Sequence, residues 1–561
     1  MKYLLSFILV LCLTNSLCAN PPNPEVFEKV RSGEIPMPYY MAHEAEMMEG
    51  LSRDFDPLNR PSQRACLDEI EYNLLVLCVD FSDNVGQVEP AFFDSLVFDT
   101  THGTVNHYFD EISYGNFVFR DIDNGTDFGW IRLPQAYEYY VNGQSGFGST
   151  HQSACGMIAD VLELTDQEID YSQYDNDEDG TIDGVIVVHA GTGGDWTGSN
   201  DHMWTMVSYS DDLIDIDGKS SFLIATISEY MATPGDLTIG QICHELGHMV
   251  FNLPDAYDLD YSSNGVGEWS IMGGGAWTRM NNEMYGSSPS HPDAASRIYM
   301  GFADPIIVSE NMFNVEIPSV NVFPTIFILW THGDPSGGQY YLVENRGHEG
   351  YDRAIPADGL LIWHFDMAVA DSGNRNEWYP GYTDSGHYLL ALEQSDGEWD
   401  MERGVNRGDA GDQYPSVSEI RSFNSSTFPN SDDYDGNLTY VAVENISDPA
   451  PVMTADLYIN QTNSSPEETV TISTEFEILA AYPNPFNPTL TAVINLPSAS
   501  TLRVDVFNIS GQKVKTLADD QYSQGQHSLG FDGAGMASGV YFIHASVPGK
   551  MNQVQKVILM K

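Results

Sequence analysis

Two histidines four residues apart constrain this chain more than any other feature. His244 and His248 form the pattern His-Glu-x-x-His with Glu245, inside a stretch of about 238–251 that predicts a helix. On a helix, residues four apart project from one face, so both imidazoles can bind a single tetrahedral zinc ion. Glu245 can then take a proton from water at the metal. The pattern therefore predicts two zinc ligands and a general base.

The end of this helix supplies a candidate third ligand. Asn252 follows Phe251, and asparagine is the residue after glycine that best tolerates a left-handed helix end. Asp255 comes just beyond this turn, and its carboxylate is a hard oxygen ligand. We predict Asp255 as the third zinc ligand, with Asp258 and then Asp260 as alternatives.

The first 19 residues determine the compartment that the sequence predicts. Lys2 precedes an apolar run over residues 3–13, and a signal-peptide cleavage site follows Ala19. The run is too short to span a bilayer, and no later stretch is long and apolar enough to do so. We expect a secreted or surface-attached protein without a transmembrane span. After Cys12 and Cys18 leave with the signal, four cysteines remain, too few for a disulfide scaffold but enough for one or two bridges: Cys66, Cys78, Cys155 and Cys243.

The charge of the chain argues against two classes of partner. The chain has 23 lysine and arginine residues against 81 aspartate and glutamate residues, a formal net charge of −58. Nucleic acids and anionic membranes carry the same sign of charge. The chain is 42% hydrophobic and 12% aromatic, which is ample for folded cores. We therefore expect no nucleic-acid partner and an affinity for cations.

Composition and periodicity divide the chain into six segments. After the signal peptide, the segment 20–69 is rich in proline and methionine, has little period, and is interpreted as a pro-segment. Strand and helix patterns alternate over 70–305, which predicts an α+β domain, whereas short strands and turns predict a β-rich domain over 306–460. A polar linker over 461–477 leads to alternating strands over 478–561, which predict one small β-sandwich.

The zinc pattern and its surroundings resemble the immune-inhibitor-A type of secreted bacterial metallopeptidase, a metzincin-like zincin. The likeness extends over about residues 70–455 and includes the stretch 267–277, which is similar to the family's Met-turn and would place Met272 beneath the metal. One departure is that Phe251 stands where the family has glycine; we interpret this as a helix one residue longer. The resemblance implies a zinc endopeptidase with one catalytic zinc ion, acting on proteins or peptides.

An acidic loop predicts a second metal site. Aspartates alternate around a glycine turn over residues 175–183, which is the ligand spacing of a calcium loop. It is not a full EF-hand, because its twelfth position is Ile186 and a strand follows. A solvated acidic turn is the alternative. The expected structural calcium ligands are Asp175, Asp177, Asp179, Thr181 and Asp183.

The pro-segment offers candidates for holding an enzyme latent. Cys66 lies just before the first core strand, and a thiolate is a strong zinc ligand. Asp54 or Asp56 is an alternative for the same role. An ordinary or bridged cysteine is the plainer interpretation of Cys66.

The last segment resembles a sorting domain of cargo for type IX secretion. Residues 482–489 open it with prolines, and the stretches 504–514, 537–542 and 556–561 continue the pattern. The resemblance implies that the outer-membrane secretion machinery is a partner. An Ig-like accessory or substrate-binding module is the alternative, because fold alone does not fix a role.

Two other functions stay open at this point. One is a surface adhesion or binding protein with a degenerate catalytic domain, against which the intact Glu245 argues. The other is a metal hydrolase acting on something other than proteins, because substrate choice depends on pocket loops that the sequence does not place.

Overall fold

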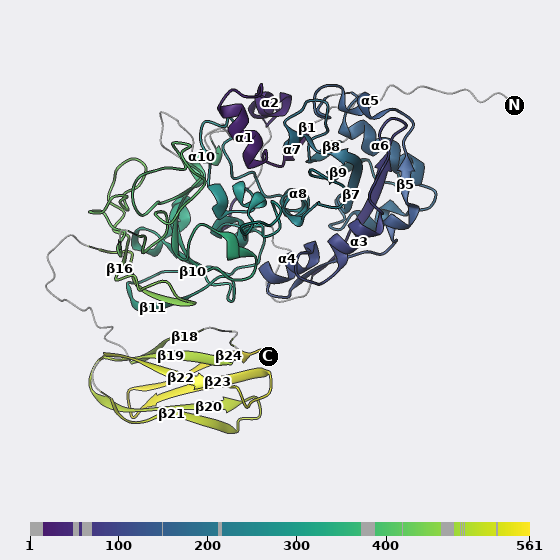
Figure 1. The fold of residues 1–561 in the computed structure, drawn as a ribbon. Coiled ribbons are helices and arrows are strands. Elements are labelled where there is room, and N and C mark those ends of the chain that lie inside the picture. The colour runs from purple at the N-terminus through teal and green to yellow at the C-terminus, as the bar shows by residue number, and fades with distance from the viewer. Residues whose placement is uncertain are drawn as a thin grey trace. The chain divides into compact units, whose positions relative to one another are not determined.

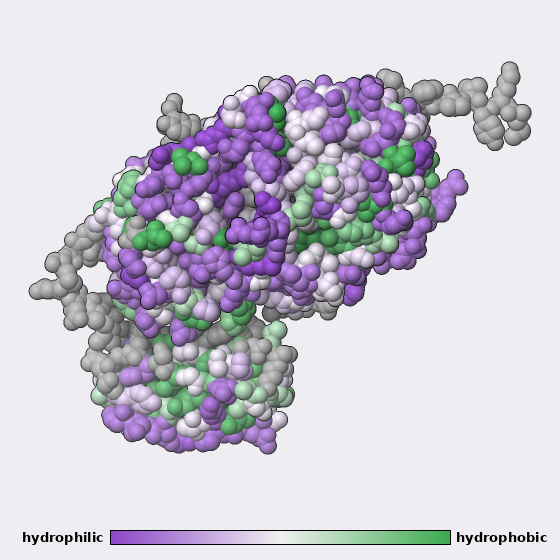
Figure 2. All heavy atoms as spheres, viewed as in Figure 1, coloured by the Kyte–Doolittle hydropathy of each residue, from purple (hydrophilic) through white to green (hydrophobic). Residues whose placement is uncertain are grey.

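The computed structural model forms two compact units, residues 1–462 and 463–561, which are described separately (Figure 1). Figure 2 shows hydrophilic residues over most of the visible face of the first unit. In the described part of the chain, no helix has the length and apolar character needed to cross a membrane. The described residues are 15–48, 55–58, 70–148, 150–210, 216–371, 388–417, 419–461, 476–482, 484, 486, 488–522 and 525–560.

A mixed sheet organises the first half of the chain. Its strand order is β1-β8-β9-β7-β3-β5, with β6 also pairing with β9. Strand β8 runs antiparallel to β9, and β1 runs antiparallel to β8, whereas β3, β5, β6, β7 and β9 pair in parallel. The strands are β1 (Asn15–Ala19), β3 (Leu75–Asp80), β5 (Trp130–Arg132), β6 (Thr181–Ile182), β7 (Val185–Thr192), β8 (Met206–Ser210) and β9 (Ser221–Tyr230).

Helices cover both faces of this sheet. Alternate residues of β3 enter two hydrophobic clusters: Val76 and Cys78 join one, and Leu75 and Leu77 join the other. Helices α3, α4, α8 and α9 contribute to the first cluster, and α5 and α6 contribute to the second. The helices are α3 (Ala91–Phe98), α4 (Val105–Ile112), α5 (Tyr137–Val141), α6 (Ala154–Thr165), α7 (Gly194–Thr197), α8 (Ile239–Phe251) and α9 (Ala294–Tyr299).

The N-terminal segment forms two helices that the weak sequence period did not predict, α1 (Pro24–Arg31) and α2 (Tyr39–Met48). Helix α1 is fixed locally, because the Asn23 side chain accepts a hydrogen bond from the Glu25 N–H and Pro24 occupies the first helical position. Its side chains then pack with those of α5 and α6 in the second cluster. Tertiary packing, more than local periodicity, therefore holds these helices.

Two further sheets occupy residues 306–460. Their strand orders are β10-β12-β13-β14-β15 and β11-β17-β16. In the first half of the chain, β2 pairs with β4 in a separate two-stranded sheet. The first cluster contains side chains from both sides of residue 305, such as Trp269 and Trp363, so the two regions share one core. The remaining elements are β2 (Ile70–Asn73), β4 (Phe117–Arg120), β10 (Ile306–Ile307), β11 (Met312–Pro318), β12 (Phe327–Leu329), β13 (Gln339–Arg346), β14 (Gly359–Asp366), α10 (Met367–Asp371), β15 (Leu390–Leu392), β16 (Ala442–Glu444) and β17 (Val452–Tyr458).

The C-terminal unit consists of antiparallel strands in two sheets, with orders β18-β19-β22 and β21-β20-β23-β24. Alternating side chains of these strands form its own hydrophobic core. The strands are β18 (Glu477–Tyr482), β19 (Thr489–Leu496), β20 (Ser500–Asn508), β21 (Lys513–Tyr522), β22 (Gly525–Asp532), β23 (Gly539–Val547) and β24 (Met551–Leu559). The protein is therefore a multidomain α/β protein with a β-rich C-terminal domain. The domain boundaries and the Ig-like and metzincin-like descriptions stay predictions.

Candidate metal centre and active site

Helix α8 carries the two predicted histidine ligands on one buried face. Thr238 precedes helix α8 in an extended conformation. All 13 residues of the helix are buried. The Nε2 atoms of His244 and His248 lie 3.0 Å apart, as expected for neighbours one helical turn apart. The helix predicted over 238–251 is confirmed, and it brings the two imidazoles together.

The turn after α8 brings Asp255 next to the imidazoles of His244 and His248. Asn252 adopts the left-handed conformation, with φ 53° and ψ 34°, as predicted. The Asn252 and Leu253 N–H groups donate back to the last carbonyls of the helix, which reverses the chain. Asp255 Oδ1 then lies 3.2 Å from His244 Nε2 and 3.1 Å from His248 Nε2.

The Nδ1 atom of each histidine makes a hydrogen bond with a backbone carbonyl oxygen. His244 Nδ1 lies 2.9 Å from Ile271 O, and His248 Nδ1 lies 2.7 Å from Leu253 O. An Nδ1–H that donates to a carbonyl leaves the Nε2 lone pair facing the shared point, the usual arrangement of metal-binding histidines. Two such lone pairs 3.0 Å apart repel each other unless a cation lies between them. The donor set of two imidazoles and one carboxylate, all within 4.8 Å of one another, therefore fits zinc.

The two alternative ligands lie elsewhere. Asp258 is buried and accepts hydrogen bonds from the Ser262 hydroxyl and the Ser263 N–H, both at 2.8 Å. Burial raises the pKa of the Asp258 carboxyl to about 7. Asp260 is exposed and accepts from the Ser262 N–H. Among the described residues, Asp255 is the carboxylate grouped with the two histidines.

Glu245 is fully buried beside this cluster. Neither carboxylate oxygen makes a hydrogen bond with the protein groups that the structure describes. Burial is the largest cause that raises the pKa of Glu245, and the charges of Asp255 and Asp195 add to it. A buried carboxyl group with a raised pKa beside the two histidines suits a proton-transferring group.

Met272 packs against helix α8 at Gly247. It is fully buried, and its Sδ occupies the space beside Gly247, where a β-carbon would lie only 2.6 Å from it. The backbone of the same turn holds the loop with Asp255, because the Ala256 N–H donates to Met272 O at 2.7 Å. The short helices η3 (Gly267–Trp269) and η4 (Gly274–Trp277) flank this turn.

The acidic loop forms only part of the expected calcium site. Asp175, Asp177 and Asp179 lie together, but Lys219 forms an ion pair with Asp175 and supplies positive charge there. Asp183 instead accepts hydrogen bonds from Asn176. Thr181 donates its N–H to Asp179 Oδ1 at 2.7 Å. The arrangement gives calcium no support, and the calcium site stays a prediction.

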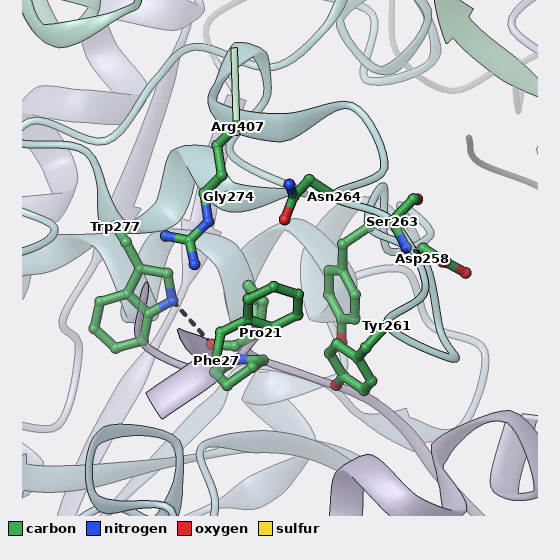
Figure 3. Close-up of a pocket in the computed structure, with 11 residues that line it drawn as sticks. Pro21, Phe27, Asp258, Tyr261, Ser263, Asn264, Gly274, Trp277 and Arg407 are labelled. Atoms are coloured by element: carbon green, nitrogen blue, oxygen red, sulfur yellow. Dashed lines mark hydrogen bonds between the residues drawn. The ribbon is translucent and has the colours of Figure 1, made fainter. Parts of the chain in front are cut away.

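Sequence reasoning missed how the N-terminal segment enters the site. Tyr257 Oη lies 2.7 Å from Ala19 O, Trp277 Nε1 donates to Pro21 O at 2.9 Å, and Trp204 Nε1 donates to Asn20 O at 2.8 Å. The close-up in Figure 3 shows the contact between Trp277 and Pro21 in a pocket that Phe27, Tyr261 and Arg407 also line. No periodic signal in the sequence marks these contacts, because they join segments more than 180 residues apart.

None of the residues expected to keep the enzyme latent is found at the metal ligands in the described part of the chain. Cys66 and Asp54 lie outside the described residues. Asp56 accepts a hydrogen bond from the Leu58 N–H and is not grouped with the metal ligands. The segment's carboxylate near Asp255 is instead Glu44, which is buried and accepts hydrogen bonds from tyrosine hydroxyls: Tyr40, Tyr257 and Tyr261. Of the cysteines predicted to remain, three are described, and all of these are buried: Cys78, Cys155 and Cys243.

Two family models match the chain. Residues 95–300 match the model described as "Immune inhibitor A peptidase M6, catalytic domain", and residues 480–560 match the "Secretion system C-terminal sorting domain". Residues 95–300 are thus similar to the catalytic domain of the immune inhibitor A peptidases, which supports a metallopeptidase. The resemblances to the immune-inhibitor-A type and to a type IX sorting domain are confirmed over these residues, and the sorting domain indicates a secreted or cell-surface protein.

Individual relatives cover only parts of the chain. Immune inhibitor A of Bacillus thuringiensis subsp. alesti is 26% identical over 263 residues, covering 39% of this chain and 37% of that protein. A PorZ structure from Porphyromonas gingivalis covers 22% of this chain and 15% of its own, with 17% identity and a TM-score of 0.12. A structure of dimeric latent PorU from the same organism covers 39% and 18%, with 13% identity and a TM-score of 0.14. TM-scores this low carry no argument about the fold.

Proposed function

We propose that this chain is a secreted zinc endopeptidase that hydrolyses peptide bonds in proteins. The observation that carries the proposal is the convergence of His244, His248 and Asp255 beside the buried Glu245. A zinc ion bound by these three residues supplies a Lewis acid that polarises a carbonyl and lowers the pKa of water.

Glu245 performs the proton transfers in this proposal. It takes a proton from the attacking water and returns it to the nitrogen of the leaving amine. Its raised pKa and its place next to His244 on helix α8 support this role. The carbonyls of Ile271 and Leu253 keep the two histidines in the tautomer that presents Nε2. No covalent intermediate with the protein is needed.

The chain is made as a precursor in this proposal. What supports it is that Asn20 and Pro21, which remain after cleavage at Ala19, accept hydrogen bonds from two tryptophan side chains: Trp204 and Trp277. The helix α2 adds Glu44, whose contacts with Tyr257 and Tyr261 fasten the segment on the side of Asp255. A segment held there competes with substrate, so its displacement is required for activity. Metzincin-like topology and cleavage of a signal peptide after Ala19 belong to the same proposal.

The C-terminal unit serves export in this proposal. The match of residues 480–560 to a sorting domain supports the outer-membrane secretion machinery as its partner. A catalytically degenerate adhesion protein is disfavoured, because such a protein has no need for Glu245 beside an assembled donor set. A hydrolase of other substrates is the remaining competitor, and the choice of substrate in the assay separates it.

Glu245→Ala tests the function directly. The full zinc-loaded chain and this variant are each treated by limited proteolysis to remove the N-terminal segment and are then incubated with unfolded casein. Zinc content is measured in both. We expect turnover to fall by about a thousandfold or more with zinc retained, because the base is lost and the ligands are kept. A Glu245→Ala protein with full activity contradicts the mechanism. A folded, zinc-loaded wild-type chain that cuts no protein after its N-terminal segment has been removed contradicts the endopeptidase assignment.

A further inference from the structure

The N-terminal segment places an aromatic side chain beside the active site. Phe27 of α1 is 8% exposed, and its ring packs against that of Tyr261, with 6.0 Å between the ring centroids. The guanidinium of Arg407 lies over the same ring, 5.5 Å from its centroid. Phe27 lies beyond the predicted cleavage site after Ala19, so it stays in the chain when the signal peptide is removed.

The contacts of Phe27 belong to the pocket drawn in Figure 3. In this view Phe27 lies between Trp277 and Tyr261, and the side chain of Arg407 points toward it. A cavity of about 30 Å³ remains beside the segment. Aromatic rings pack well on one another, and a cation over the face of a ring is attracted to it. The pocket therefore suits an aromatic side chain better than an aliphatic one.

A row of stacked rings joins this pocket to the metal centre. Tyr257 also lines the pocket, and its ring centroid lies 6.5 Å from that of His244 and 6.0 Å from that of Tyr261. Phe27 follows Tyr261 in the row, so the pocket lies three rings from a predicted zinc ligand. Since an extended chain advances about 3.3 Å per residue, a peptide bound at the metal reaches the pocket within about six residues.

Residues outside the N-terminal segment hold the walls of the pocket. The loop with Arg407 is fastened to the stretch 264–268 by two backbone hydrogen bonds. Met401 O accepts from the Asn264 N–H at 3.0 Å, and Arg407 O accepts from the Glu268 N–H at 2.7 Å. Arginine keeps its charge at every pH that a protein meets. The pocket therefore retains both its walls and its cation when the segment leaves.

We propose that Tyr261, Trp277 and Arg407 form a substrate subsite that selects an aromatic side chain, and that Phe27 occupies this subsite until the N-terminal segment is removed. The ligand class is a peptide with an aromatic residue within about six residues of the cleaved bond. The catalytic meaning of the subsite rests on the proposed peptidase function. Its binding meaning can be tested without turnover.

The first experiment measures binding to a chain that lacks the catalytic base. The full zinc-loaded Glu245→Ala chain is treated by limited proteolysis to remove its N-terminal segment and is titrated with a fluorescent peptide of residues 20–37. We expect Phe27→Leu in the peptide to weaken binding at least about fivefold, because leucine offers no ring face to the guanidinium. Met37→Leu, at a residue that is 47% exposed, is the control peptide and should bind like the parent. Equal binding of the Phe27→Leu peptide overturns the subsite.

A change in the protein separates the cation from the loss of apolar area. Arg407→Gln is added to the same chain, and the parent peptide and its Phe27→Leu form should then bind within about twofold of each other. Arg403→Gln, at an exposed arginine of the same loop, is the matched control and should keep the full difference. An equal preference for phenylalanine in Arg407→Gln overturns the role of the cation and with it the proposal.

The second experiment measures selectivity in cleavage. The zinc-loaded wild-type chain, after the same proteolysis, receives peptides of one alanine-rich sequence in which a single Phe or Leu occupies successive positions. We expect one position at which Phe raises kcat/KM at least about fivefold over Leu. Arg407→Gln should lower this ratio below about twofold, and Arg403→Gln should leave it unchanged. A ratio near one at every position, or the same ratio in Arg407→Gln, overturns the proposal.

The two experiments separate failure of the subsite from failure of the proposed function. If the segment peptide binds with the expected preference but no peptide is cut, the subsite stands as a binding site and the peptidase assignment fails. If the Phe and Leu peptides are cut equally and Glu245→Ala abolishes the cleavage, the peptidase assignment stands and the subsite fails.

Discussion

The sharpest test of the metal centre replaces each of the three candidate carboxylates in turn. In Asp255→Ala the two histidine Nε2 atoms, 3.0 Å apart, keep their carbonyl partners but lose the oxygen that lies 3.1–3.2 Å from both. We expect this variant to bind zinc far more weakly. Asp258→Ala and Asp260→Ala should keep wild-type affinity, because Asp258 is engaged by Ser262 and Ser263, and Asp260 is exposed.

The size of the effect follows from the number of ligands lost. Removing groups that merely orient a ligand costs about 10- to 100-fold in metal affinity, so loss of one of three ligands should cost about 100-fold or more. With free zinc at about 1,000 times the wild-type Kd, zinc stabilises the fold by about 4.1 kcal/mol. At a 100-fold weaker Kd the same zinc concentration contributes only about 1.4 kcal/mol. The holo protein should therefore lose about 2.7 kcal/mol of stability.

Two measurements check this expectation. Zinc affinity is measured by competition with a chromogenic chelator, and thermal unfolding is followed with and without zinc for all three variants. The unfolding shift produced by zinc should shrink in Asp255→Ala and stay at the wild-type value in the other two. The reasoning is refuted if Asp255→Ala retains wild-type zinc affinity while Asp258→Ala or Asp260→Ala loses it.

Three further predictions concern packing, calcium and pH. Met272→Ala should destabilise the zinc-loaded protein by about 2–5 kcal/mol, because it leaves a cavity against Gly247. Denaturant unfolding measures this loss, and a change below about 0.5 kcal/mol contradicts the prediction. If the acidic loop binds calcium, added calcium should raise the unfolding temperature of the wild type and not of Asp177→Ala; an equal response in both refutes that site. Burial raises the pKa of Asp412 to about 7. Between about pH 4 and 7 the Asp412 carboxyl is therefore protonated in the folded chain and ionised in the unfolded chain. The free energy of unfolding should fall as the pH rises through this range. Asp412→Asn avoids this loss and should unfold at a higher temperature than wild type at pH 8 but not at pH 4; an equal difference at both pH values counts against the buried acid.

Local chemistry made the helix and its end predictable. The four-residue spacing of His244 and His248 has meaning only on a helix, and α8 covers the predicted range. Asn252 was recognisable as its end because few residues accept positive φ without strain. The strands β3 and β7 followed from continuous apolar runs, which suit strands covered on both faces.

Other parts of the site left no local signal. Helix α1 contacts α7 and helix α2 contacts β1, so their stability does not depend on a strong period of their own. Arg407 is unremarkable in the sequence until the fold places Phe27 against its guanidinium. The sequence put Asp255 ahead of Asp258 and Asp260 as the third zinc ligand, and the path of the chain after the turn groups Asp255 with the two histidines.

The sequence by itself determined the chemistry available to this protein: two imidazoles one turn apart, a carboxylate between them in the chain, and an aspartate beyond a left-handed turn. These features depend on contacts within about 12 residues, and local geometry sets them. The tertiary structure decided which carboxylate joins the histidines, which carbonyls orient them, and which side chains hold the N-terminal segment. Those choices join segments as far apart as Ala19 and Tyr257, because only packing of the whole core brings such distant groups within hydrogen-bond range.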